Sequence, residues 1–259
     1  MSIIDKITDS QIIKHSKKSR IILADIDDSN QIDGTEKKII IKELSSDLFS
    51  VYQRLSLIQS QHFPKIYELE QRNEYLLVAE EYIEGRMLAD ILSERAFFPQ
   101  EALHVMLQLC SGIACLHHFS PPVIHRDLTP WNLLLTNDQT VKIIDFDAAR
   151  IYKPNARCDT RRLGTAEYAP PEQFGFSQTD ERSDIYSMGV ILYELIYCRA
   201  FHHTEEHFSN QAKHRKINHI ITRCTMFSPC QRYQSVEELR RELIRALPLK
   251  TRLHYYREN

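Results

Sequence analysis

Short apolar runs separated by polar turns dominate the first 82 residues of the chain. They predict β-strands at 11–13, 21–26, 38–42 and 75–80. Between the third and fourth runs, apolar residues recur at the spacing of one helical face, namely at Leu48, Val51, Tyr52, Leu55 and Ile58. We therefore expect a small β-rich region that contains one helix.

Helical spacing of apolar residues prevails from residue 86 onward. Two short β-like runs, 133–135 and 141–144, and a long irregular segment, 147–173, interrupt it. The stretch 102–124 lacks Asp, Glu, Lys and Arg, but it contains histidine and glutamine and keeps its apolar residues on one face. We expect a buried helix there and no membrane span. The pattern as a whole predicts an α+β fold with a small β-rich lobe followed by a larger helical lobe.

Composition narrows the possible functions. The chain has only six glycines in 259 residues, where average usage predicts about 18. No two glycines are closer than 11 positions, which excludes a glycine-rich dinucleotide loop, a P-loop and a GxSxG nucleophile turn. A net charge of −2 argues against a nucleic-acid partner. The cysteines lack CxxC spacing and the amino-terminal residues do not resemble a signal peptide, so we expect a cytoplasmic protein.

One group of polar residues points to phosphoryl transfer. Asp127 lies in the run His125-Arg126-Asp127, Asn132 follows five residues later, and Asp145 comes after the second short β-like run. In such an arrangement one carboxylate accepts the proton of a hydroxyl nucleophile. The other Asp and the Asn hold Mg²⁺ against the phosphates.

These residues stand in strings that resemble the eukaryotic-type (Hanks-type) serine/threonine protein kinases, in particular a compact bacterial member. The matching strings are HRDLTPWN, VKIIDFD, GTAEYAPPEQ, SDIYSMGVILYEL and SPCQRYQS. The resemblance implies a two-lobed kinase domain over 11–247. Its N-lobe would cover about 11–82, its hinge 80–86 and its C-lobe about 86–247, followed by a tail at 248–259.

The resemblance implies ATP and Mg²⁺ as cofactors and an unidentified protein as the substrate. Asp127 would be the catalytic base, while Asn132 and Asp145 would be the Mg²⁺ ligands. Lys42, in the string KIIIKEL, would hold the α- and β-phosphates. The adenine would bond the backbone carbonyl of Glu81 and the backbone N–H of Ile83 in the hinge.

The resemblance also implies supporting roles. Thr165 would hydrogen-bond Asp127 and favour serine or threonine acceptors. Asp184 would brace the backbone of the catalytic loop, which the string HRDLTPWN (125–132) matches. Arg232 would be the buried partner of Glu172.

Regulation by a phosphate is a further expectation. Arg126 would read a phosphate on the activation segment, and Thr160, set among arginines, is the candidate for autophosphorylation. The alternative for this segment is a solvated basic loop.

The chain departs from the family around the nucleotide. The turn where the family has its glycine-rich loop reads KHSKKSR. Its basic residues would replace the loop as phosphate donors, or would form an ordinary solvated turn; they are Lys14, Lys17, Lys18 and Arg20. Asp147 stands where Gly follows Asp145-Phe146, a position at which glycine would tolerate positive φ.

The helix that normally supplies a Glu partner for the phosphate-binding lysine contains none, and Arg54 aligns there. We expect Glu80, at the position of the family's gatekeeper, to pair with Lys42 instead. The alternative is that Glu80 is merely a polar gatekeeper. A buried carboxylate without a partner would be costly, which favours the pair.

Three functions remain open on this sequence. The first is an active protein serine/threonine kinase, which keeps Asp127, Asn132 and Asp145. The second is a pseudokinase that serves as a binding or scaffold module, because the glycine-rich loop and the helical Glu are missing. The third is a small-molecule phosphotransferase of the aminoglycoside or choline kinase type, against which the strings 164–173 and 183–195 argue. The oligomeric state is not predicted.

Overall fold

The computed structural model describes residues 2–15, 19–26, 37–154, 164–175, 177–202 and 214–255. The chain divides into two compact units, one ending at Glu84 and the other beginning at Gly85. Each unit has its own buried core and is described by itself.

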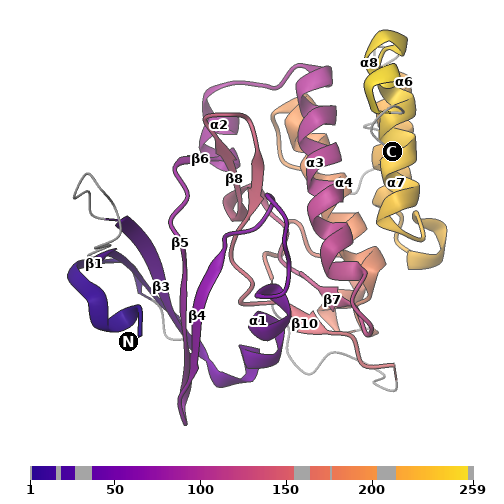
Figure 1. Ribbon diagram of the computed structural model, residues 1–259. Helices are drawn as coiled ribbons and strands as arrows, with labels where there is room; N and C mark the ends of the chain where they lie inside the picture. Colours follow the sequence, from indigo (N-terminus) through magenta and orange to yellow (C-terminus); the bar gives the residue numbers. More distant parts are fainter. Residues whose placement is uncertain are drawn as a thin grey trace. The chain divides into compact units, whose positions relative to one another are not determined.

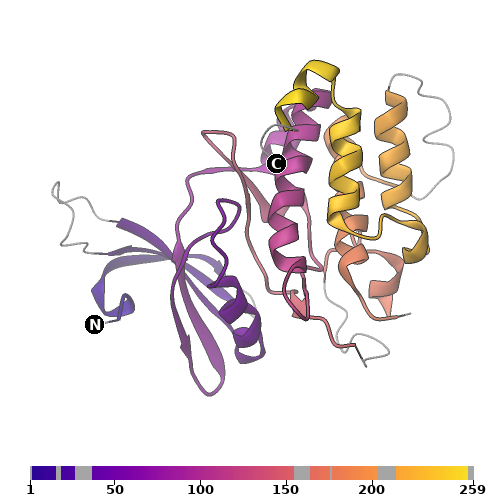
Figure 2. The same ribbon diagram turned by 45° about the vertical axis from the view of Figure 1, so that its right-hand side comes forward.

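The first unit is built on a five-stranded antiparallel sheet with the order β1-β2-β3-β5-β4 (Figure 1). The strands are β1 (Ile7–His15), β2 (Arg20–Ile26), β3 (Lys37–Ser45), β4 (Ile66–Gln71) and β5 (Tyr75–Glu81). One 3₁₀ turn, η1 (Ile4–Lys6), precedes the sheet, and a second, η2 (Ser46–Leu48), leads into the helix α1 (Phe49–Leu55), which lies beside β4 (Figure 2).

One face of this sheet carries a compact apolar cluster. Its buried members are Ala24, Ile26, Ile39, Ile41 and Ala79. Because side chains alternate along a strand, the residues next to these on β3 and β5 point to the opposite face. Lys42 and Glu80 belong to that opposite face.

The second unit is mainly helical. Its helices are α2 (Leu88–Glu94), α3 (Pro99–His117), α4 (Glu181–Tyr197), α6 (Arg215–Cys224), α7 (Val236–Ala246) and α8 (Leu249–Tyr255). It also has a small sheet with the order β6-β8-β9 and a two-stranded pair of β7 with β10. These strands are β6 (Gly85–Met87), β7 (Val123–Ile124), β8 (Leu133–Thr136), β9 (Val141–Ile143) and β10 (Arg150–Ile151). Three 3₁₀ turns, η3 (Pro130–Asn132), η4 (Pro171–Phe174) and η6 (Pro229–Gln231), join these elements.

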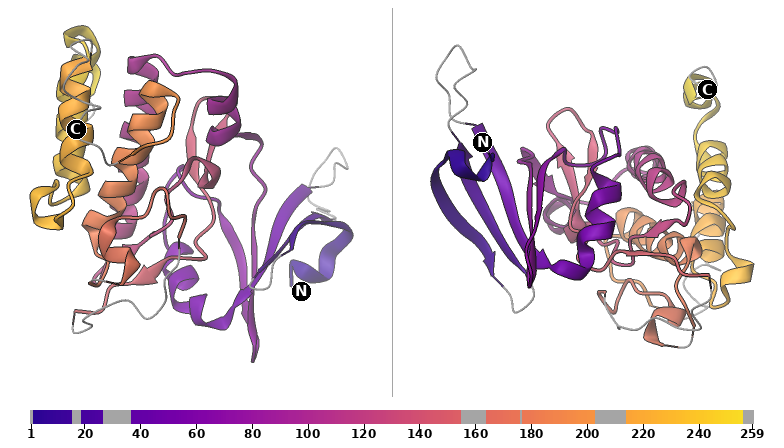
Figure 3. Two further views of the ribbon diagram at one scale, coloured as in Figure 1. Left: turned by 180° about the vertical axis from the view of Figure 1, so that it is seen from behind. Right: turned by 60° about the horizontal axis from the view of Figure 1, so that its bottom comes forward.

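The helix α4 is the centre of the second unit. It packs against α3, α6 and α7 (Figures 2 and 3). Most of its side chains are buried, including Ile185, Met188 and Ile191. Of the stretch 102–124, predicted as a buried helix, residues 102–117 belong to α3, whereas Val123–Ile124 form β7. Within the described residues, no helix combines the length and apolar character needed to cross a membrane.

The predicted α+β class, with a β-rich region followed by a helical one, is confirmed. Several elements differ from the sequence prediction. Strand β1 is longer than the predicted run 11–13, and β10 and most of η4 lie within the segment 147–173 that was predicted to be irregular. Strand β4 was not predicted, because Glu68 and Glu70 break up its apolar residues and all but its last residue are half-buried. The helix α1 ends at Leu55 instead of reaching Ile58, and Leu57 just beyond it is 70% exposed.

Candidate active site

The hairpin of β8 and β9 brings Asn132 and Asp145 to one end of a small sheet. Leu133 pairs with Ile143 at the open end of this antiparallel hairpin, so the residue before β8 and the residues after β9 lie together. The backbone N–H of Ile144 donates to the carbonyl of Asn132 at 3.0 Å, which extends the pairing by one step. Local strand pairing thus brings together Asn132 and Asp145, which are 13 positions apart in the sequence.

Asp127 is held by donors from two segments of the second unit. The Asn132 side-chain amide donates to the backbone carbonyl of Asp127 at 2.8 Å and to its carboxylate at 3.3 Å. Thr165 donates to Asp127 Oδ1 twice, from its backbone N–H at 2.8 Å and from its hydroxyl at 2.9 Å. The expected contact between Thr165 and Asp127 is therefore present, and the carboxylate is fixed in one orientation.

Two residues of this loop region adopt positive φ. They are Arg126, at 69°, and Asp145, at 66°. The sequence had pointed to Asp147, which stands where the family has Gly, but that residue is not among those with positive φ. Its N–H instead donates to Asp145 Oδ1 at 3.1 Å. The left-handed conformation, which strains non-glycine residues, thus falls on a candidate metal ligand.

Asp184 braces the backbone of the catalytic loop, as expected. Its carboxylate, wholly buried at the start of α4, accepts the backbone N–H groups of His125 and Arg126, each at 2.9 Å. His117, on α3, donates to the same carboxylate from Nε2 at 2.9 Å. Burial opposes the charged form, but the hydrogen bonds from His117 and the backbone hold the pKa of Asp184 below its ordinary value.

His125 is a packing residue. It is fully buried, and its ring centroid lies 5.0 Å from that of Phe146. Its Nδ1 accepts the backbone N–H of Asp127 at 3.4 Å. Burial lowers the pKa of His125, although Asp184, Asp127 and Asp145 act in the opposite direction, so the neutral form is favoured.

Gln173 ties the segment 164–175 to the loop that carries Asp127, and Gly164 leaves room for the close approach. The Gln173 side chain donates to the carbonyl of Arg126 at 2.8 Å. Gly164 has a φ of 109°, and a side chain at this position would collide with the same carbonyl and with Gln173. The Arg126 side chain is also buried and donates to the carbonyl of Ala148 at 3.3 Å.

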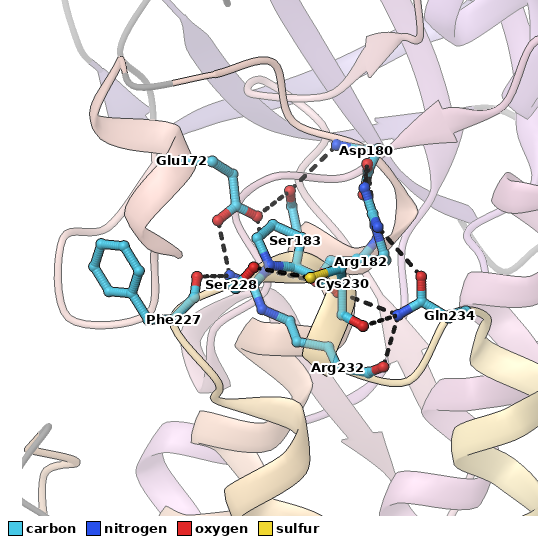
Figure 4. Close-up of polar contacts among 10 residues, drawn as sticks. Glu172, Asp180, Arg182, Ser183, Phe227, Ser228, Cys230, Arg232 and Gln234 are labelled. Atoms are coloured by element: carbon cyan, nitrogen blue, oxygen red, sulfur yellow. Dashed lines mark hydrogen bonds and ion pairs between the residues drawn. The ribbon is translucent and has the colours of Figure 1, made fainter.

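The expected pair of Glu172 and Arg232 forms a buried ion pair at the end of the same segment (Figure 4). It is bidentate: Arg232 Nη1 lies 2.7 Å from Glu172 Oε1, and Nη2 lies 2.8 Å from Oε2. The Ser183 hydroxyl adds a third donor to this carboxylate at 2.8 Å. The guanidinium also donates to the carbonyls of Phe227 and Arg182 (Figure 4). A further hydrogen bond runs from Arg232 Nε to the carbonyl of Met226 at 2.8 Å. Both charges are thus matched by hydrogen bonds, as burial requires.

In the first unit, Lys42 pairs with Glu80. The Nζ of Lys42 lies 2.7 Å from Glu80 Oε1, and both side chains are 5% exposed. The pair that the sequence analysis expected is present. Of the residues expected to bind adenine, Glu81 ends β5 and Ile83 follows it outside any strand or helix, and both are half-buried.

The structure describes only some of the residues that were predicted to bind or carry a phosphate. Lys14 and Arg20 lie near the ends of β1 and β2, where His15 pairs with Arg20. Lys17, Lys18 and Thr160 lie outside the described residues.

The donor set of the second unit fits Mg²⁺ bound together with a nucleotide. Asn132 uses its amide nitrogen toward Asp127, which leaves the amide oxygen to serve as a ligand, and Asp145 supplies a carboxylate. Mg²⁺ is commonly held by one or two protein oxygens with the remaining ligands from phosphates and water. Across the described ranges, no group of three or more His, Cys, Asp and Glu residues is arranged to hold a metal alone.

A cavity of about 540 Å³ opens beside the segment that follows Thr165. It is mostly apolar. Its lining residues are Ala166, Glu167, Ala169, Pro171, Phe174, Tyr186, Ala200, Phe201, His202 and Phe227.

Sequence reasoning missed two residues that shape this site, His117 and Gln173. Each makes its contact with a residue distant in the chain, 67 and 47 positions away respectively. For His117, the only signal in the sequence was a histidine in the last turn of a predicted buried helix. For Gln173 there was none beyond its place in a matching string.

Comparison with known proteins shows which proteins this chain is similar to. Serine/threonine-protein kinase A of Synechocystis sp. is 32% identical over 191 residues, which cover 63% of this chain and 37% of that protein. PrkC of Bacillus subtilis is 27% identical over 209 residues, 74% of this chain and 32% of that protein. PknB of Mycobacterium tuberculosis is 30% identical over 185 residues, 64% of this chain and 29% of that protein.

The chain thus aligns with 29% to 37% of the length of these curated serine/threonine kinases. A family model of the protein kinase domain matches residues 11–252, nearly the whole chain. By that match, the protein belongs to the protein kinase domain family.

Proposed function

We propose that the protein is a serine/threonine kinase that transfers the γ-phosphate of ATP to a hydroxyl of a protein substrate. The observation that carries this proposal is the setting of Asp127. Its carboxylate is oriented by Thr165, and the same loop holds Asn132 beside the strand that leads to Asp145. A scaffold that bound nucleotide without transferring phosphate would have no need of an oriented carboxylate here.

In the proposed reaction, Asp127 accepts the proton of the acceptor hydroxyl. The hydroxyl oxygen bonds to the γ-phosphorus while the bond from that phosphorus to the bridging oxygen breaks, so ADP leaves and a phosphate ester forms. Asn132 and Asp145 hold Mg²⁺, which when bound neutralises charge on the phosphate oxygens.

The first unit supplies nucleotide contacts in this proposal. Lys42 binds the α- and β-phosphates through its ammonium group. The backbone carbonyl of Glu81 and the backbone N–H of Ile83 bind the adenine, so the identity of these two side chains matters little.

Two features support a protein acceptor over a small polar molecule. Thr165, which contacts Asp127, is followed directly by Ala166 at the edge of the cavity described above. Apart from Glu167 and His202 this lining is apolar or aromatic, which suits side chains of a polypeptide better than a polycationic aminoglycoside. We also place the reaction in the cytoplasm, a proposal supported by the free thiols of Cys110 and Cys224 in the core.

The proposal is tested by incubating the protein with Mg-ATP, alone and with a generic basic protein, and following phosphate transfer. The wild type is compared with Asp127→Asn and with Asp90→Asn, a control at an exposed position of α2. We expect transfer by wild type and control, and a loss of at least about a hundredfold in Asp127→Asn, since general base catalysis contributes on that order.

Other outcomes would replace the proposal. ATP binding without transfer by the wild type would identify a pseudokinase. Transfer to choline or an aminoglycoside, with none to protein, would identify a small-molecule phosphotransferase.

A further inference from the structure

The register of β3 and β5 places Lys42 and Glu80 on the same face of the first unit's sheet. Lys42 pairs with Val78, and Ile40 pairs with Glu80, so Lys42 and Glu80 are diagonal neighbours two positions apart. Ile41 and Ala79, which alternate with them, belong to the apolar cluster on the other face. Diagonal neighbours on adjacent strands lie within reach of long side chains. The ion pair therefore follows from strand pairing alone, between strands that run side by side (Figure 1).

The pair is buried as well as close. With 2.7 Å between Nζ and Oε1 and only 5% exposure of each side chain, neither charge has bulk water as an alternative partner. Loss of one partner would leave the other as a costly buried charge. The carboxylate therefore restricts where the lysine ammonium can lie.

The neighbouring helix offers no competing carboxylate. The sequence of α1 is FSVYQRL, which contains no acidic residue and carries Arg54 in its last turn. Glu43 follows Lys42 on β3, but strand alternation directs it to the opposite face. Asp47, in η2 before the helix, is exposed.

We infer that Glu80 is a positioning residue for the nucleotide phosphates, acting through Lys42, and that it makes this function independent of α1. The inference rests on the proposed kinase function. Because both partners belong to one sheet, the ammonium is in place as soon as β3 and β5 pair. Displacement of the helix cannot switch the lysine off, so regulation of this protein has to act elsewhere.

The test compares Glu80→Gln, Glu43→Gln and Gln53→Gly with the wild type. Glu80→Gln keeps the volume and removes the charge. Glu43→Gln removes a charge from the opposite face of the same strand, and Gln53→Gly loosens α1 at an exposed position. For each protein the measurements are kcat and KM for Mg-ATP, the equilibrium affinity for a fluorescent ATP analogue, and the thermal melt.

We expect Glu80→Gln to lower kcat/KM at least about tenfold, the loss typical of a charge-assisted hydrogen bond. The two controls should stay within about twofold of the wild type, since loosening an exposed helix position costs little. A role in stability alone would lower the melting temperature and leave kcat, KM and affinity of the folded protein unchanged. If Glu80→Gln does not fold, Glu80→Asp, which retains the charge on a shorter side chain, should show the same loss in smaller degree.

The outcomes separate this inference from the proposed function. Transfer at wild-type rates by Glu80→Gln would overturn the inference and leave the kinase proposal standing. If Gln53→Gly lowered kcat/KM for Mg-ATP as much as Glu80→Gln does, the inferred independence from α1 would be overturned. If the wild type transfers no phosphate, the kinase proposal fails, and the analogue decides the inference: weaker binding by Glu80→Gln alone supports it, and equal binding by all variants overturns it.

Discussion

At the scale of single residues, the catalytic loop depends on a histidine that does not titrate freely. His125 is fully buried, and its Nδ1 already accepts the backbone N–H of Asp127, which needs an unprotonated nitrogen. Its Nε2 is buried with no hydrogen-bond partner among the described residues. Protonation would therefore bury a charge and would break the hydrogen bond from the Asp127 backbone N–H.

This setting predicts how stability depends on pH. Burial lowers the pKa of His125 in the folded state, so between its unfolded pKa of about 6.5 and its folded pKa only the unfolded chain binds the proton. The contribution of neutral His125 to the free energy of unfolding is therefore complete above the unfolded pKa. It is lost progressively as pH falls from the unfolded pKa toward the folded one. We expect the chain to lose stability through this residue as pH falls below about 6.5, with a slope that for one proton does not exceed about 1.4 kcal/mol per pH unit.

The measurement is urea unfolding of wild type, His125→Phe and His219→Gln at several pH values. Wild type should lose stability relative to His125→Phe as pH falls, while His219→Gln, changed at an exposed histidine of α6, should parallel the wild type. A difference between wild type and His125→Phe that is the same at pH 7.5 and 5.5 would contradict the prediction.

At the scale of elements, the pair of Glu172 and Arg232 joins η4 to the turn η6, 60 residues later. Arg232 is 1% exposed, and its guanidinium reaches three backbone carbonyls as well as the carboxylate. Glu172→Gln would leave this cation without a counter-charge, so we expect a loss of about 3–5 kcal/mol in the free energy of unfolding. The double variant Glu172→Met with Arg232→Met should recover much of that loss, because no unpaired charge remains.

Chemical denaturation of these variants checks the prediction. Glu94→Gln is the matched control, since its pair with Arg86 is largely exposed and should contribute little. If Glu172→Gln proved as stable as Glu94→Gln, the buried pair would not hold the two turns together.

The elements also show what the sequence could predict and why the rest was missed. The helices α3 and α4 were found because their apolar residues recur at helical spacing over 19 and 17 residues. Strand β4 was not, since its half-buried residues alternate weakly and its central positions carry Glu68 and Glu70. The end of α1 was placed too late because Ile58 fits the helical spacing, although the backbone leaves the helix at Ser56.

At the scale of the whole molecule, the chemistry-bearing residues could be predicted because each stands in a string typical of a family. The contacts of Asp127, Asp184 and Glu172 follow from that resemblance and are present. The positive φ of Asp145 and the hydrogen bond of His117 were not predicted. They depend on how distant segments meet, and no local pattern of residues records this.

The division into two units predicts that the second unit folds without the first. Residues 85–259 have their own core around α4, and the Glu172 pair and the brace of Asp184 lie wholly within them. A domain with its own core can fold alone. We expect this fragment to keep its helical circular dichroism and to unfold cooperatively, yet to transfer no phosphate, because it lacks Lys42.

The fragment also offers an internal check on the previous prediction. Since the contacts of Glu172 and Arg232 lie within residues 85–259, Glu172→Gln should cost the same free energy in the fragment as in the whole chain, within about 0.5 kcal/mol. Denaturation of the four proteins, whole chain and fragment with and without the substitution, measures both costs. A fragment without a cooperative transition, or one in which the substitution has no effect, would mean that this core depends on residues 1–84.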